Sequence, residues 1–164
     1  MATKQKPKKL IIGWFSYSCC EDSTIMMTEI LNDHYTEWLK YLDFKYAKVL
    51  RKHTKAGPMD IAFVEGAIAS KKQEDELKEV RKNAKKLIAI GSCACTGMPS
   101  GHRNVFDSQT KKEIKAIMEK FHYGEKVKKV EDVVAVDAKV PGCPMNSKKF
   151  VDLVESVIAE FKTT

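Results

Sequence analysis

The residues of this sequence best suited to chemistry are its five cysteines, Cys19, Cys20, Cys93, Cys95 and Cys143. In a cytoplasmic chain, cysteines are more often metal ligands or catalytic thiols than disulfides, and the odd count also argues against a complete disulfide framework. Four thiolates that converge can hold zinc or an iron–sulfur cluster. Structural zinc sites usually draw on paired CxxC motifs, which this sequence lacks. The cysteines therefore favour an iron–sulfur cluster, with zinc as the alternative.

The elements that must position these cysteines follow from the apolar pattern. Continuous apolar runs predict buried strands at 10–15, 60–64, 87–90 and 133–136, with a weaker strand at 46–50. Helices are predicted at 23–42, 70–86, 111–121 and 146–161, and Ser70 with Gln73 has the spacing of a capping box. Strands that alternate with helices predict an α/β domain with an open parallel sheet and helices on both faces.

Every cysteine lies just beyond the carboxyl end of a predicted strand. Cys19 and Cys20 follow the first strand, and Cys93 and Cys95 lie in a predicted loop at 91–107. Cys143 follows the strand at 133–136, and Glu65 directly follows the strand at 60–64. Because parallel strands end at one edge of the sheet, where open α/β sheets bind their ligands, we expect these residues to share one crevice.

The charge pattern narrows the classes of partner. The net charge is +7, but nearly all cations are lysines mixed with glutamates, and arginine, which base and phosphate readers favour, is scarce. We therefore expect no nucleic-acid partner. No apolar run reaches the length of a membrane span, and the stretch at 10–15 is too short for a secretory signal, so a cytoplasmic location is expected. Residues 1–8 are expected to form a flexible basic tail, and 9–164 a single domain.

Four motifs resemble those of a known family. They are SCCEDS at 18–23, FVEGAI at 63–68, GSCACTGMPSGHRN at 91–104 and VPGCP at 140–144, and together they span nearly the whole chain. In this order and spacing they resemble the small subunit of NiFe hydrogenases and the related 20 kDa subunit of respiratory complex I. The resemblance implies a flavodoxin-like domain that holds one 4Fe-4S cluster against a large catalytic subunit, which would carry a NiFe centre.

The resemblance also implies a ligand set, namely Cys20, Cys93 and Cys143 with Cys19 as the fourth. Hydrogenase small subunits usually begin with CxxC, but Tyr17 stands three residues before Cys20. The adjacent Cys19 and Cys20 are instead similar to the complex I arrangement. Cys95 is then not a ligand in this set. It becomes the fourth ligand if two neighbouring cysteines cannot both reach the cluster. A redox-active pair of Cys93 and Cys95 is a further alternative.

Three other residues fall within the matching motifs. Glu65 corresponds to the family's glutamate near the large subunit, where it could relay protons or form a hydrogen bond across the interface; the alternative is a strand-end glutamate in solvent. Arg103 could offset the negative charge of a cysteine-bound cluster or contact the partner. His102 is more simply explained as a surface residue.

The sequence thus predicts the electron-transfer small subunit of a cytoplasmic NiFe hydrogenase, a chain that is not catalytic alone. Five cysteines are too few for a second four-thiolate cluster, so electrons would leave through a further electron-carrier subunit. The nearest alternative is a complex-I-like subunit that passes electrons to a quinone or another carrier. An alternative of another class is a zinc-stabilised protein that binds an acidic partner through its lysines.

Overall fold

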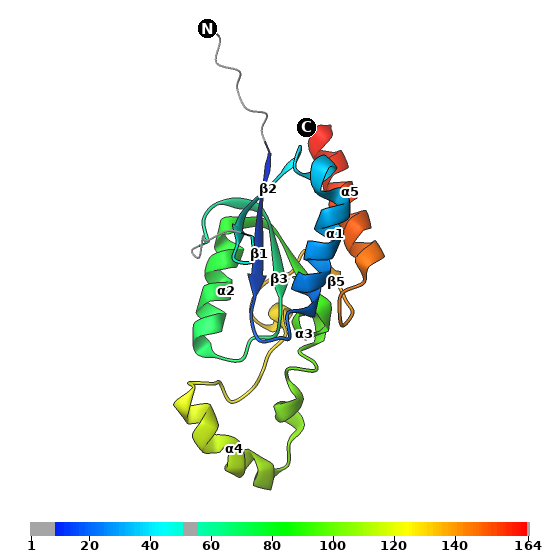
Figure 1. Cartoon of the computed structure of the whole chain (residues 1–164). Helices are drawn as coiled ribbons and strands as arrows, with labels where there is room; N and C mark the ends of the chain where they lie inside the picture. Colours follow the sequence, from blue (N-terminus) through cyan, green and yellow to red (C-terminus); the bar gives the residue numbers. More distant parts are fainter. Residues whose placement is uncertain (1–8, 51–55, 164) are drawn as a thin grey trace.

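A five-stranded sheet forms the centre of the protein, for which a computed structural model describes residues 9–50 and 56–163 (Figure 1). The strands are β1 (Leu10–Ser16), β2 (Leu42–Ala47), β3 (Met59–Glu65), β4 (Ala84–Ile90) and β5 (Ala138–Val140). They are all parallel, in the order β2-β1-β3-β4-β5. This is the flavodoxin-like order, so the predicted fold class is confirmed. The predicted tail at 1–8 lies outside the described residues.

Helices cover both faces of this sheet. Helices α1 (Asp22–Trp38) and α5 (Ser147–Lys162) lie together on one face, and α2 (Lys71–Asn83) lies on the other (Figure 1). Adjacent strand residues point to opposite faces, so Phe63 packs beneath α1 and α5 whereas Val64 joins the core on the α2 side. The chain therefore has two apolar layers, as expected for strands that are buried on both sides.

Two predicted strands are misplaced. The strand weakly predicted at 46–50 corresponds to β2, which begins earlier, at Leu42. The earlier start is possible because the first helix, which was predicted to reach residue 42, ends at Trp38. In β2, buried Leu42 and Phe44 alternate with half-buried Asp43 and Lys45, and these charged residues mask the strand in the sequence.

The prediction of a strand at 133–136 is wrong. The edge strand of the sheet is β5, and it lies at Ala138–Val140. Pairing with β4 begins at Asp137, whose backbone N–H donates to the Leu87 carbonyl at 2.9 Å and whose carboxylate accepts from the Leu87 N–H at 2.7 Å. The valines at 133–136 pack instead against the α2-side core from an irregular segment.

The region after β4 is more helical than predicted. The predicted loop at 91–107 contains the short helix α3 (Gly91–Thr96) and a 3-10 turn at His102–Val105. The predicted amphipathic helix is present as α4 (Ser108–Lys120), but none of its residues is buried, and it lies away from the sheet (Figure 1). Among the described residues, no helix combines the length and the apolar character needed to cross a bilayer.

Candidate metal centre

Three segments at the carboxyl edge of the sheet carry the cysteines. Cys19 and Cys20 lie between β1 and α1, Cys93 and Cys95 lie on α3 directly after β4, and Cys143 follows β5. The prediction that all five cysteines lie beyond strand ends is therefore confirmed, although β5 is not the strand that the sequence indicated. The parallel topology brings residues more than a hundred positions apart to one edge.

Four of the five cysteines line one small cavity at this edge, namely Cys19, Cys20, Cys93 and Cys143. The Sγ atoms of Cys20 and Cys143 and a carboxylate oxygen of Asp22 all lie within 4.8 Å of one another, and the three side chains are exposed. Cysteine thiols from three separate segments thus line a common space that is open to the surface. This donor set suits a metal ion or an iron–sulfur cluster.

The other two cysteines of the cavity are less exposed. Cys93 is buried and packs in a small apolar cluster with Ala67 and Val127, against which Cys19 is also packed. The Sγ of Cys93 lies 3.2 Å from the Ser100 hydroxyl. The cavity therefore has a less exposed side, formed by half-buried Cys19 and buried Cys93, and an exposed side, formed by Cys20 and Cys143.

Cys95 does not line this cavity. It is buried in the α2-side core, and its Sγ lies 3.5 Å from the Ala89 carbonyl, to which the thiol donates. Because residues two apart on a helix point in nearly opposite directions, Cys93 and Cys95 on α3 cannot both face the cavity. The structure therefore separates Cys95 from the four cysteines that it brings together.

Glu65 braces the first cysteine segment from the end of β3. Its carboxylate accepts a hydrogen bond of 2.9 Å from the Ser23 backbone N–H and one of 2.6 Å from the Thr24 hydroxyl. These donors lie in the first turn of α1, where N–H groups have no partner within the helix. Glu65 is only 3% exposed, so the alternative of a glutamate in solvent is wrong. Its role as a proton relay or interface contact stays a prediction.

Ser23 extends this brace to the last cysteine segment. Its hydroxyl accepts a hydrogen bond of 3.2 Å from the Met145 N–H, two residues after Cys143. The Ser92 N–H, beside Cys93, donates to the Gly142 carbonyl at 2.7 Å. These hydrogen bonds therefore tie the three cysteine-bearing segments to one another and fix their spacing.

Gly91 is required where β4 turns into α3. Its φ is +78°, a backbone conformation that L residues rarely adopt. A Cβ at this position would also lie 2.9 Å from the Ser23 hydroxyl oxygen. The close approach of α3 to the start of α1 thus depends on the missing side chain.

The protein environment disfavours the thiolate forms of Cys19 and Cys20. Burial raises the pKa of Cys19 to about 12, and the nearby Glu65 and Cys93 contribute to the rise. At Cys20 the Asp22 backbone N–H lowers the pKa, but the Asp22 carboxylate, partial burial and Cys143 outweigh it and leave the pKa raised. Binding of a metal must therefore displace protons from these thiols.

Arg103 and His102 lie outside the cysteine cavity. The Arg103 guanidinium donates to the carbonyls of Gly124 at 2.9 Å and Ala69 at 3.3 Å, so it ties the α4 region to the segment after β3. His102 is exposed and packs edge-on against Phe106. Arg103 thus has a structural contact that the sequence did not predict, and His102 occupies a surface position.

The sequence also did not identify Asp22, Ser23 and Ser100 as site residues. Asp22 and Ser23 belong to the SCCEDS motif, which was the available signal. Their significance depends on contacts with Cys143, Glu65 and Met145, which are distant in sequence.

The chain is similar to proteins of known identity. Residues 19–157 match the family described as NADH ubiquinone oxidoreductase, 20 kDa subunit. A subunit of the F420-non-reducing hydrogenase of Methanothermobacter marburgensis is 25% identical, over 92% of this chain and 54% of its own length. The gamma subunit of the coenzyme F420 hydrogenase of Methanosarcina barkeri is 29% identical, over 83% and 49%. The chain spans about half the length of the curated relatives it matches.

Solved structures share the fold. The crystal structure of an NAD+-reducing [NiFe]-hydrogenase in the H2-reduced state matches with a TM-score of 0.82 and 20% identity, over 93% of both chains. The [NiFeSe] hydrogenase of Desulfovibrio vulgaris Hildenborough matches with a TM-score of 0.62 and 14% identity, over 95% of this chain and 62% of that one. At these identities the likeness concerns the fold alone.

Proposed function

The chain belongs to the family of the 20 kDa subunit of NADH ubiquinone oxidoreductase, and from this premise we propose that it is the electron-transfer small subunit of a NiFe hydrogenase. It would hold one 4Fe-4S cluster on Cys19, Cys20, Cys93 and Cys143. A large catalytic subunit would carry the NiFe centre, and a further subunit would take the electrons away.

One observation carries this proposal: four cysteines from three separate segments line one cavity at the carboxyl edge of the sheet. Thiolates are the usual ligands of a 4Fe-4S cluster, which supplies one-electron transfer when bound. The remaining parts of the site suit the same role. The hydrogen bonds of Glu65 and Ser23 hold the ligand segments in place, and the Ser100 hydroxyl lies beside Cys93.

The hydrogenase role is supported by the relatives, since the matched subunits of the F420-non-reducing and coenzyme F420 hydrogenases align with 92% and 83% of this chain. A complex-I-like subunit is the second candidate, and the adjacent Cys19 and Cys20 together with the family match favour it. The two candidates share the cluster and differ in the metal of the partner.

The test is a metal and sulfide analysis of the complex, purified without oxygen from its native host. The hydrogenase proposal expects nickel in the complex and, in this chain, iron and acid-labile sulfide in equal amounts of about four per chain. Iron without nickel would replace it with the complex-I-like candidate. Zinc without sulfide would reject both and leave the zinc-stabilised binding protein.

The division of labour can be tested separately. Hydrogen turnover is expected from the complex and not from this chain alone, because its described residues supply one cluster site and no second group of converging ligands for a catalytic metal. Turnover by the purified chain would contradict this part of the proposal.

A further inference from the structure

The Ser100 hydroxyl contacts the buried cysteine of the cysteine cavity. Its oxygen lies 3.2 Å from the Sγ of Cys93, which is 6% exposed, and Ser100 itself is half-buried. Between a thiol and a hydroxyl either group can donate, but a thiolate that binds a metal has no proton to give, so only the hydroxyl can then be the donor. Cys93 as a ligand would therefore accept a hydrogen bond from Ser100.

A tight turn after α3 returns Ser100 to Cys93. The Gly97 N–H donates to the Cys93 carbonyl at 2.9 Å, and the Gly101 N–H donates to the Gly97 carbonyl at 2.7 Å. A Cβ at Gly101 would lie 2.6 Å from the Gly97 carbonyl oxygen, so the turn closes this tightly because position 101 has no side chain. Backbone hydrogen bonds thus place the Ser100 hydroxyl beside the sulfur.

The exposed side of the cysteine cavity carries a group of opposite character. A carboxylate oxygen of Asp22 and the Sγ atoms of Cys20 and Cys143 all lie within 4.8 Å of one another. A carboxylate accepts hydrogen bonds but has none to donate, and it brings a negative charge. A donor therefore lies beside one proposed ligand, and an anion lies beside two others.

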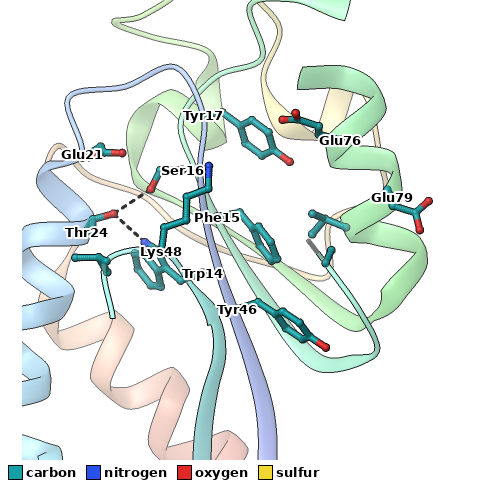
Figure 2. A pocket seen from close by; sticks show the side chains of 13 residues that line it. Trp14, Phe15, Ser16, Tyr17, Glu21, Thr24, Tyr46, Lys48, Glu76 and Glu79 are labelled. Atoms are coloured by element: carbon teal, nitrogen blue, oxygen red, sulfur yellow. Dashed lines mark hydrogen bonds between the residues drawn. The ribbon is translucent and has the colours of Figure 1, made fainter. Parts of the chain in front are cut away.

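Buried contacts fix the start of α1, which carries Asp22. Thr24, two residues later, donates its hydroxyl hydrogen to the Glu65 carboxylate at 2.6 Å. The same hydroxyl oxygen accepts a hydrogen bond of 2.8 Å from the Trp14 indole N–H (Figure 2). The backbone of the first turn is thus held from β1 and β3, and the Asp22 carboxylate stays at the mouth of the cavity.

We propose that Ser100 and Asp22 set the reduction potential of the bound cluster in opposite directions: the Ser100 hydroxyl raises it, and the Asp22 carboxylate lowers it. Reduction adds one electron from an external donor, and the added negative charge spreads over the cluster and its sulfurs. A hydrogen bond to the Cys93 sulfur stabilises that charge, whereas a nearby carboxylate repels it. This inference rests on the proposed function, because it concerns the same cluster.

The first test is a redox titration of the whole chain, purified without oxygen with its cluster, followed by electron paramagnetic resonance. Ser100→Ala should make the equilibrium constant for one-electron reduction about tenfold smaller, which lowers the midpoint potential by about 59 mV. Ser100→Thr keeps the hydroxyl and should stay near the wild-type potential. An unchanged potential in Ser100→Ala, or an equal shift in both variants, would overturn the role of the hydroxyl.

The hydrogen bond itself has a spectroscopic signature that a purely structural role would not produce. In deuterated buffer, electron–nuclear double resonance of the reduced wild-type chain should show an exchangeable deuteron coupled to the cluster, and Ser100→Ala should lack one such coupling. This measurement needs no variant to be decisive in one direction. The absence of any coupled exchangeable deuteron from the wild-type chain would overturn the proposal.

The second test removes the charge of Asp22. Asp22→Asn should raise the equilibrium constant for reduction about threefold, a smaller effect than at Ser100 because the carboxylate is exposed to solvent. Salt at 1 M, where the Debye length is about 3 Å, should diminish this shift and leave that of Ser100→Ala. Asp33→Asn is the matched control, since Asp33 is exposed on α1 and does not line the cavity. Equal shifts in the two Asn variants would contradict a specific effect.

Iron and acid-labile sulfide are measured in the same samples. Wild-type cluster content with unchanged potentials in Ser100→Ala and Asp22→Asn would reject this inference and leave the proposed function intact. Absence of iron and sulfide from the wild-type complex of the native host would instead reject the proposed function, and this inference with it.

Discussion

The cysteine-bearing edge and the region that follows it in sequence are built in opposite ways. At the edge, the Glu65 carboxylate and the Ser23 hydroxyl accept hydrogen bonds, and the Ser92 N–H donates one, so that segments far apart in the chain are connected. The arm, residues 97–126, contains α4, which has no buried residue, and its apolar Ile117 and Phe121 are 57% and 58% exposed. The edge is organised before any partner arrives, whereas the arm carries apolar surface that the described chain does not cover.

This difference indicates a division of roles. Ligand positions need a fixed geometry, and buried polar contacts supply it. The arm is fixed at its base, where the Asn104 amide bonds both to the Val127 carbonyl at 2.7 Å and to its N–H at 2.8 Å. Farther along, its exposed apolar side chains suit contact with another protein. Substitutions at the cysteine-bearing edge should therefore have larger effects on the isolated chain than substitutions in the arm.

The largest effect is expected at the cysteines. Cys93→Ser should abolish the visible absorption of the cluster and the bound iron, because Cys93 faces the cavity and serine is a poor substitute for a thiolate. Cys95→Ser is the matched control on the same helix and should keep iron and sulfide near the wild-type amount, since Cys95 lies in the apolar core. Cluster loss in Cys95→Ser with retention in Cys19→Ser would show that the proposed ligand set is wrong.

The second effect concerns the hydrogen bonds that the Glu65 carboxylate accepts from Ser23 and Thr24. Glu65→Gln should lower the free energy of unfolding by about 1–3 kcal/mol, because one amide group must replace an oxygen that accepts from a buried donor. Urea denaturation of the cluster-free chain measures this cost. Glu113→Gln in the arm changes an exposed carboxylate that accepts a hydrogen bond from the Gln109 side chain, and it should change stability by less than about 0.5 kcal/mol. An equal loss of unfolding free energy in the two variants would contradict the difference between the cysteine-bearing edge and the arm.

The sequence predicted the part of this site that depends on local patterns. Apolar runs located β1, β3 and β4, and parallel topology then placed Cys19, Cys20 and Cys93 at one edge. It misplaced β5 because that short strand depends on contacts of Asp137 with Leu87, fifty residues away. It left Cys95 as an alternative ligand because a predicted loop gives no relative orientation, whereas helix α3 turns Cys93 and Cys95 in different directions.

The surroundings of Glu65 were equally beyond sequence patterns. It was predicted to follow a strand directly and is the last residue of β3, but its burial depends on donors that α1 supplies across the fold. The capping box shows the same limit on a smaller scale. The Ser70 hydroxyl accepts from the Gln73 N–H at 3.2 Å, as the spacing predicts, while the Gln73 side chain accepts from the Ala69 N–H at 2.7 Å.

A glycine in each region gives the third prediction. Gly91→Ala should cost about 1–2 kcal/mol of unfolding free energy, since it places a side chain in a left-handed conformation and against the Ser23 hydroxyl. Gly124→Ala in the arm should cost less than about 0.5 kcal/mol, because its nearest contact would be an ordinary 3.5 Å to the Ala69 carbonyl. Thermal unfolding of the two variants side by side measures the difference, and a larger cost at Gly124 would contradict it.

The smallest effect on the stability of the isolated chain is expected for a substitution of Ile117 in the arm. This substitution should have a clear effect only in the complex. Ile117→Ser should change the free energy of unfolding by less than about 0.5 kcal/mol, because this side chain is already in solvent. Ile158→Ser is the matched core variant: Ile158 is 3% exposed, and its loss should cost about 2–5 kcal/mol.

In the complex the same arm variant should have a clear effect. If the proposed large subunit packs on the arm, Ile117 becomes buried, and its loss should weaken association about tenfold or more. Lys112→Ser, on the same helix and also exposed, controls for a change of surface residue. Titration of the chain against the purified large subunit measures both variants. Unchanged affinity in Ile117→Ser would show that this exposed apolar residue of the arm has no role in the contact. The contact would then have to be sought at the cysteine-bearing edge.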